Sequence, residues 1–291
     1  MLEKASDHAP EPIEDPGGIA FRTAACCPSG RIDLLRAASA LVLDARPEAD
    51  LGLIESQVSI WAARLSSRLR HAGCLDDPLA AALRLSEMLY DEEGFAVDQV
   101  APHDPANVEL DLVLERRLGV PLSLALIQVE VGRRAGLPLR GLCGPGRLFV
   151  GLEVPPRPLL FDPKDRGRLV LPESCPALVE SGTPGLSLRA EFQRPLTERR
   201  WLERLLGHLK RGYLRRSDPF AAIRAQGRLI DLRPGDVSPL QERARLAFQV
   251  GRHQEALHDL EKAVSMASDE SSGRLVRRQL EQVRRWIAAM S

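Results

Sequence analysis

The 291-residue sequence predicts an α+β fold followed by an all-helical part. Apolar residues recur with helical periodicity between residues 31 and 135, and they do so again from Thr197 onward. Between these stretches, at residues 139–171, lie short strand-like runs separated by Gly and Pro. Because the strands follow the helices as a group instead of alternating with them, an α+β arrangement is favoured over a βαβ one.

The N-terminal part is expected to be a tail followed by helices. Residues 1–30 are expected to be a disordered tail, because they offer too little apolar surface to offset the entropy of ordering. Gly119 and Pro121 are suited to end one helix and begin the next, and Gly136 is suited to end the second. Helices are expected over residues 31–72, from Pro78, over 108–117 and from Pro121 to about Ala135.

A meander of short strands should complete the first domain. Breakers such as Gly144-Pro145-Gly146 separate runs of apolar residues that are too short for helices. We expect the domain to span residues 31–195, with the Pro-, Gly- and Ser-rich residues 172–195 as a connecting segment. The expected strands lie at residues 139–143, 148–154, 159–162 and 169–171.

The C-terminal part, residues 197–291, contains an internal repeat. With a period of 34 residues, Leu206 aligns with Leu240 and Ala222 with Ala256. This period is typical of tetratricopeptide helical hairpins, in which small residues let two helices approach closely. The helix expected over residues 274–290 would cap the array. Because two hairpins and a cap are near the minimum for a repeat array, they should pack on the preceding domain.

Composition and charge exclude several classes of function. Forty basic residues balance forty acidic ones, so the net charge is zero. Long-range attraction to nucleic acid or to an anionic membrane is therefore not expected. No run reaches the roughly 20 apolar residues of a membrane helix, and the acidic, proline-rich N-terminus lacks the apolar core of a signal peptide. We expect a cytoplasmic protein.

The cysteines indicate reduced thiols and neither a metal site nor a cofactor. They show no CxxC pair and no Cys/His cluster with zinc spacing, and His253 and His258 are wrongly spaced for one metal ion. The adjacent thiols of Cys26 and Cys27 could bind metal or be oxidised, but nothing else in the sequence supports this. The five cysteines are Cys26, Cys27, Cys74, Cys143 and Cys175.

Residues 104–163 carry a series of motifs in a recognisable order. The motifs are Asp104-Pro105-x-Asn107, Val113-Leu114-Glu115-Arg116-Arg117-x-Gly119-x-Pro121-x-Ser123-Leu124, Gly136-Leu137-Pro138, Gly144-Pro145-Gly146-Arg147-x-Phe149-Val150 and Phe161-Asp162-Pro163. In this order and spacing the chain resembles bacterial transglutaminase-like proteins of the invasion-regulator Sir-B type, which also carry C-terminal tetratricopeptide repeats. The resemblance covers roughly residues 36–290. It implies a papain-like core of a helix against an antiparallel sheet, and a bacterial regulatory or interaction factor.

The resemblance also implies a catalytic Cys at a helix N-terminus, a His on the next strand and an Asp on the following strand. Here the helix start, Pro121 to Ser123, contains no cysteine. Arg147 stands where many relatives have His, and only Asp162 matches the pattern. Because a guanidinium stays protonated at physiological pH, Arg147 cannot act as a general base. We therefore expect no acyl transfer by this triad.

The remaining residues leave several interpretations open. Arg147 and Asp162 are expected on adjacent strands, where they would form a structural ion pair. Alternatively Ser123, Asn107, Arg147 and Asp162 would form a vestigial cleft that binds an anion or a peptide. Cys143 fits a strand core better than a displaced nucleophile.

Three functions follow from these patterns. The leading hypothesis is a non-catalytic adaptor or regulator that holds a protein or peptide partner on its C-terminal repeats. The alternative is a cysteine- or serine-type hydrolase or acyltransferase with an atypical site. A third function, nucleic-acid binding through residues 199–216, depends on Trp201 and Tyr213 among basic residues, although both also fit an apolar stripe.

Overall fold

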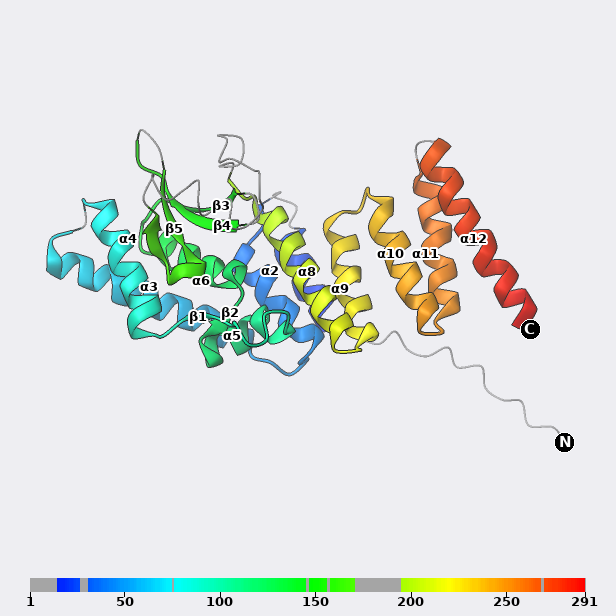
Figure 1. Cartoon of the computed structure of the whole chain (residues 1–291), viewed down its shortest axis with the longest axis horizontal. Coiled ribbons are helices and arrows are strands. Elements are labelled where there is room, and N and C mark those ends of the chain that lie inside the picture. Colours follow the sequence, from blue (N-terminus) through cyan, green and yellow to red (C-terminus); the bar gives the residue numbers. More distant parts are fainter. Residues whose placement is uncertain are drawn as a thin grey trace.

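The computed structural model describes residues 15–26, 31–74, 76–144, 147–155, 158–170, 195–267 and 270–290 (Figure 1). The molecule is elongated, with α3, α4 and the sheet towards one end and α12 at the other (Figure 1). The first half contains the helices α1 (Pro16–Ala25), α2 (Leu34–Ala40), α3 (Leu51–Ala72), α4 (Pro78–Ser86), α5 (Leu110–Arg116) and α6 (Pro121–Arg134). Shorter helical segments are η1 (Leu41–Asp44), the π-helix η2 (Glu87–Glu92), η3 (Pro105–Asn107) and η4 (Pro163–Asp165).

The predicted strand meander forms one antiparallel sheet in the order β3-β4-β5-β6. Its strands are β3 (Leu139–Gly144), β4 (Arg147–Leu152), β5 (Leu159–Asp162) and β6 (Arg168–Val170). The predicted α+β fold class is thus confirmed. A short parallel pair of β1 (Ala96–Val97) and β2 (Leu118–Gly119) was not expected, because β1 lies in a stretch whose sequence looks irregular.

Helix α6 is the centre of the first half. It packs against β3 and β4 on one side and against α3 and α4 on the other. Its side chains are therefore buried almost all round, as expected of a helix enclosed by other elements. Pro121 begins α6, and Gly136 adopts a φ of 90° just beyond its end, as Gly does at helix C-termini.

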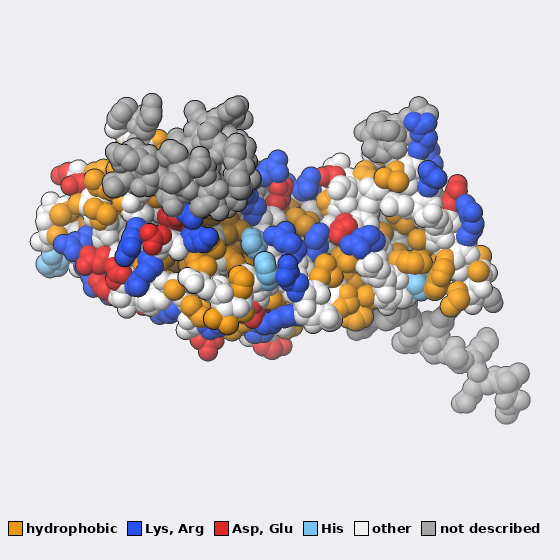
Figure 2. All heavy atoms as spheres, in the orientation of Figure 1, with side chains coloured by type: hydrophobic (Ala, Val, Ile, Leu, Met, Phe, Trp, Pro, Cys, Tyr) orange, Lys and Arg blue, Asp and Glu red, His pale blue; other side chains and the backbone are white. Residues whose placement is uncertain are grey.

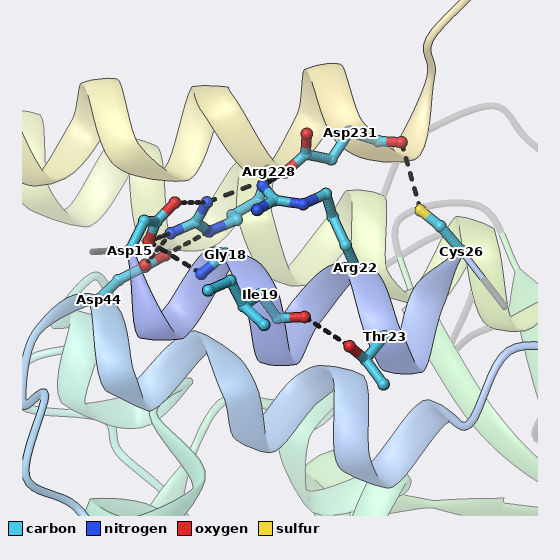
Figure 3. Close-up of polar contacts among 9 residues, drawn as sticks. All are labelled: Asp15, Gly18, Ile19, Arg22, Thr23, Cys26, Asp44, Arg228 and Asp231. Atoms are coloured by element: carbon cyan, nitrogen blue, oxygen red, sulfur yellow. Dashed lines mark hydrogen bonds and ion pairs between the residues drawn. The ribbon is translucent and has the colours of Figure 1, made fainter. Parts of the chain in front are cut away.

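The prediction of a disordered tail is wrong for residues 15–26, which contain α1. Asp15 caps this helix, and the Phe21 side chain is fully buried. The helix packs on α2, on η1 and on α9 (Pro219–Leu232) of the C-terminal part. Its anchor is Arg228 on α9, which forms ion pairs with Asp15 and with Asp44 (Figure 3). Residues 1–14 and 27–30 of the predicted tail, residue 171 of the predicted fourth strand and residues 172–194 of the predicted connection lie outside the described residues.

The C-terminal part is a row of antiparallel helices (Figure 1). Residues that are equivalent in the 34-residue period are equally buried, as for Leu206 and Leu240 or Ala222 and Ala256. The helices are α8 (Glu198–Arg215), α9, α10 (Val237–Gln249), α11 (His253–Met266) and α12 (Glu270–Met290).

Helix α8 belongs to both parts of the molecule. It packs along α9, but it also closes one side of the α/β part. The indole Nε1 of Trp201 donates a 3.2 Å hydrogen bond to the carbonyl of Leu122, and the Tyr213 hydroxyl lies 2.6 Å from a carboxylate oxygen of Glu109. The repeats therefore lean on the first domain through their first helix.

Candidate functional site

Arg147 and Asp162, the two residues of the expected triad that lie on the sheet, form an ion pair with little exposed surface. Arg147 at the start of β4 donates from Nη1 to Oδ2 of Asp162 at the end of β5, at 2.6 Å. Oδ1 of Asp162 accepts the backbone N–H of Lys164 at 2.8 Å. Both oxygens of the carboxylate are therefore engaged, and the side chain of Asp162 is only 3% exposed.

The electrostatics of this pair reflect its burial. Burial raises the pKa of Asp162, while the N–H of Lys164 and the charge of Arg147 act to lower this pKa. In an intact triad an Asp would orient an imidazole, whereas here it holds a guanidinium. Because the guanidinium keeps its proton, the pair positions charge but cannot carry a proton between reacting groups.

Ser123 does not reach the surface at this position. Its side chain is fully buried, and its hydroxyl lies 2.7 Å from the carbonyl of Asn107 in η3. Asn107 is also fully buried, and its Nδ2 donates to the carbonyl of Ala101 at 2.8 Å. The expectation that Ser123 and Asn107 contribute to a binding cleft is therefore corrected. The Ser123 side chain ties the start of α6 to η3, and the Asn107 side chain ties η3 to the preceding loop at Ala101.

Cys143 is partly buried and packs against the hydrophobic core, in keeping with the strand-core interpretation. It lies on β3 opposite Leu148, and burial raises its pKa, so the thiol stays protonated at neutral pH. Among the described residues, no cysteine lines the cleft beside Arg147 and Asp162. Nor do the described residues contain a group of three or more His, Cys, Asp or Glu side chains arranged to hold a metal ion.

A cleft of about 350 Å³ does open at Arg147 and Asp162, and it takes one wall from α8. Arg204 and His208 of α8 face the N-terminus of α6 across it. In Figure 2, Lys and Arg side chains gather beside histidines over the middle of the visible face, where α8 runs in Figure 1. The lining residues are Val120, Pro121, Leu122, Gly144, Arg147, Leu148, Asp162, Lys164, Arg204 and His208.

Arg204 and His208 were not expected at this cleft, because the sequence pattern places α8 in the C-terminal repeats. The available signal was their position three and seven residues after Trp201, which places them near the same side of α8, although the Arg204 side chain is exposed. Burial lowers the pKa of His208 to about 4, and the positive charges of Arg211, His103 and Arg204 act in the same direction. At neutral pH this imidazole is therefore uncharged, and the described residues lining the cleft include no Cys, Ser or Thr that it could activate.

The aromatic residues of α8 are not available for stacking on bases. Trp201 and Tyr213 are 2% and 7% exposed, and both pack on the first domain. The apolar-stripe interpretation is thus confirmed. Because base stacking needs exposed rings, α8 lacks the aromatic platform of a single-stranded nucleic-acid site.

A second hollow, of about 410 Å³, lies on the repeats between α10 and α12. Phe248 and Trp286 form part of it, with ring centroids 5.3 Å apart in an edge-to-face arrangement, and Trp286 is 37% exposed. Four glutamines, Gln241, Gln249, Gln279 and Gln282, surround this apolar floor. We call this hollow the repeat groove.

No helix among the described residues is long and apolar enough to cross a membrane.

Comparison with known proteins supports both halves of the architecture. The family profile of the transglutaminase-like superfamily matches residues 53–207, and a tetratricopeptide-repeat profile matches residues 209–281. The junction between the two matches falls within α8, in keeping with the double role of that helix. No solved structure matches the chain.

The relatives are bacterial proteins named UPF0162. One from Pseudomonas aeruginosa is 34% identical over 70% of this chain and 76% of its own length. One from Xylella fastidiosa is 31% identical over 81% of this chain and 84% of its own, and one from Vibrio cholerae is 27% identical over 66% and 72%. The chain therefore belongs to the transglutaminase-like superfamily and is a relative of the bacterial UPF0162 proteins with C-terminal tetratricopeptide helices.

Proposed function

We propose that this protein is a non-catalytic adaptor or regulator that binds a protein or peptide partner. The observation that carries the proposal is the ion pair of Arg147 and Asp162, at the positions where the family resemblance would lead one to expect a catalytic His–Asp pair. Loss of general acid–base help alone costs roughly 10²–10⁴ in rate. The fully buried Ser123 adds no nucleophile, so acyl transfer at this cleft lacks both chemical roles.

The repeat groove is the main binding surface in this proposal. Its floor of Phe248, Val283 and Trp286 offers apolar contact, and its glutamines can donate to and accept from a peptide backbone. An apolar floor with a few polar groups at the rim is typical of sites that bind peptides or small molecules. The free thiols of Cys26, Cys74 and Cys143 support a reducing, cytoplasmic setting.

The test of binding uses point variants of the full chain. Deleting the repeats from residue 197 would remove α8, and with it the Trp201 contact and a wall of the cleft, so a lost partner would have two explanations. Gln282→Arg instead places a long charged side chain in the repeat groove. Arg285→Ala, on the exposed side of α12 with 79% exposure, is the matched control.

Proteins captured from the source cells by the tagged wild type and by the two variants are then quantified by mass spectrometry. The proposal expects a set of partners that Gln282→Arg loses and Arg285→Ala keeps. Identical sets for all three proteins would remove the repeat groove from the proposal.

The hydrolase or acyltransferase alternative is tested on the purified protein. Peptide esters and amine acceptors are offered, and thiol- and hydroxyl-directed electrophiles are used as labels. The adaptor proposal expects no turnover and no selective labelling. Turnover that disappears in Ser123→Ala or Cys143→Ala would establish an enzyme and overturn the proposal.

A further inference from the structure

The cleft beside Arg147 carries an excess of positive charge. Arg147, Lys164 and Arg204 contribute three cations and Asp162 one anion, so the balance is 3 − 1 = +2, with His208 uncharged. Asp162 is already engaged by Arg147. Within the described part of the chain, the side chains of Lys164 and Arg204 form no ion pair, although most other arginines do.

The cations come from separate elements that meet at one opening. Arg147 begins β4, Lys164 lies in η4 after β5, and Arg204 projects from α8. Only Nη1 of Arg147 is bonded to Asp162, which leaves its other nitrogens for a ligand. The first turn of α6 lies at the same opening and adds the partial positive charge of a helix N-terminus. The arrangement is therefore suited to an anionic group with several oxygen acceptors.

The remaining walls are apolar and limit the size of the ligand. Val120, Pro121 and Leu148 line the cleft next to the cations. At about 350 Å³ the cleft is near the lower end of the roughly 300–1,000 Å³ range of ligand pockets. This volume suits one or two amino-acid side chains. The carboxylate of Asp162 at its floor would repel a dianionic phosphate more strongly than a singly charged group.

We propose that this cleft binds a carboxylate of a peptide partner together with an adjacent apolar side chain. The carboxylate is either an acidic side chain or the C-terminus of the partner. This inference deepens the proposed function, since it depends on a peptide-binding role, but it concerns a surface separate from the repeat groove. The cleft would select the end or an acidic segment of a ligand, while the groove holds other parts of the same partner.

Trp201 provides a local probe for the test. Its indole N–H donates to the carbonyl of Leu122, a residue of the cleft wall. The chain has three tryptophans, Trp61, Trp201 and Trp286, so a ¹⁵N-indole-labelled sample gives three signals that single Trp→Phe variants assign. Three probes are titrated into the full chain: N-acetyl-leucine with a terminal carboxylate, N-acetyl-leucyl-glutamic acid amide with a side-chain carboxylate, and uncharged N-acetyl-leucinamide.

We expect a saturable shift of the Trp201 signal with at least one of the two carboxylate probes and none with N-acetyl-leucinamide. The probe that binds tells a chain end from an acidic side chain. Arg204→Ala and Lys164→Ala should each weaken this binding by about tenfold, since each removes a charge-assisted contact. Arg200→Ala, one turn earlier on α8 and paired with Glu203, is the matched control and should bind as the wild type does.

Two results would overturn the proposal. The first is that neither carboxylate probe shifts the Trp201 signal. The second is that the uncharged probe shifts this signal as much as a carboxylate probe does, or that Arg204→Ala binds the carboxylate probe as tightly as the wild type. Unchanged Trp61 and Trp286 signals show that the Arg204, Lys164 and Arg200 variants are folded, and Trp61 alone serves for Gln282→Arg, which lies beside Trp286. Gln282→Arg should bind the carboxylate probes as the wild type does. A negative titration at the cleft therefore does not affect the repeat-groove proposal, and a negative capture experiment with Gln282→Arg does not affect the cleft proposal.

Discussion

The buried guanidinium of Arg228 holds the N-terminal helix against both halves of the molecule (Figure 3). Its side chain is 6% exposed, and its nitrogens lie 2.5 and 2.7 Å from the two carboxylate oxygens of Asp15 and 2.5 Å from Asp44. Burial raises the pKa of Asp44, although hydrogen bonds from Arg228 act to lower it. The variant Arg228→Met keeps most of the side-chain volume and removes the charge.

This variant leaves the carboxylate of Asp44 buried without its cation. Removing one partner of a buried ion pair costs about 3–5 kcal/mol. Because Asp15 is half exposed and can regain water, the lower end, about 3 kcal/mol, is the expected loss in the free energy of unfolding. Urea unfolding followed by circular dichroism measures it. Asp44→Asn in the Arg228→Met background should recover much of the loss, since the uncompensated charge is gone.

An exposed ion pair gives the control. The side chains of Arg84 and Glu87 are 57% and 50% exposed. Arg84→Ala should therefore change the free energy of unfolding by less than about 1 kcal/mol. If Arg228→Met loses no more than Arg84→Ala, or if Asp44→Asn destabilises the Arg228→Met background further, then the network is not an energetically coupled buried pair and the reasoning fails.

Three further predictions concern the cleft and its wall. His208 has a folded pKa of about 4 against its ordinary 6.5, so stability that is complete above pH 6.5 should fall as the pH drops towards 4; urea midpoints measured across this range should fall less steeply for His208→Gln. Gly141→Ala would place a methyl group 2.3 Å from the ring of Trp201, and we expect a loss of about 1–3 kcal/mol by urea unfolding, whereas an unchanged midpoint would show that the ring moves freely. The double variant Ser123→Cys, Arg147→His introduces the residue types of the expected triad. It should not hydrolyse peptide esters, because the side chain at position 123 is buried. Measurable turnover would contradict this argument from burial.

Local signals in the sequence predicted the core of the first domain well. Gly119, Pro121 and Gly136 delimit α6, and the breakers between short apolar runs indicated the meander. Helix α1 could not be predicted in this way. Its apolar face is short, and the residue that anchors it, Arg228, lies 213 residues away from Asp15 in the sequence.

The candidate site was predictable only where it depends on neighbouring strands. The sequence order placed Arg147 and Asp162 on adjacent strands, and they are in contact. The direction of the Ser123 hydroxyl depends on a carbonyl of η3, which no periodicity reveals. The short repeat array predicted that the repeats pack on the first domain, but it did not show that α8 makes this contact or that Arg204 and His208 line the cleft.

Because α8 packs on both the first domain and α9, it restricts where recombination could join the two parts of this protein. A recombination event that exchanged the repeat array at its first helix would leave the indole-binding carbonyl of Leu122 uncovered and the cleft without one side. A breakpoint after α8 would instead strip the array of the helix on which α9 packs. Inheritance of both halves as one unit therefore keeps the contacts that α8 makes with the first domain and with α9.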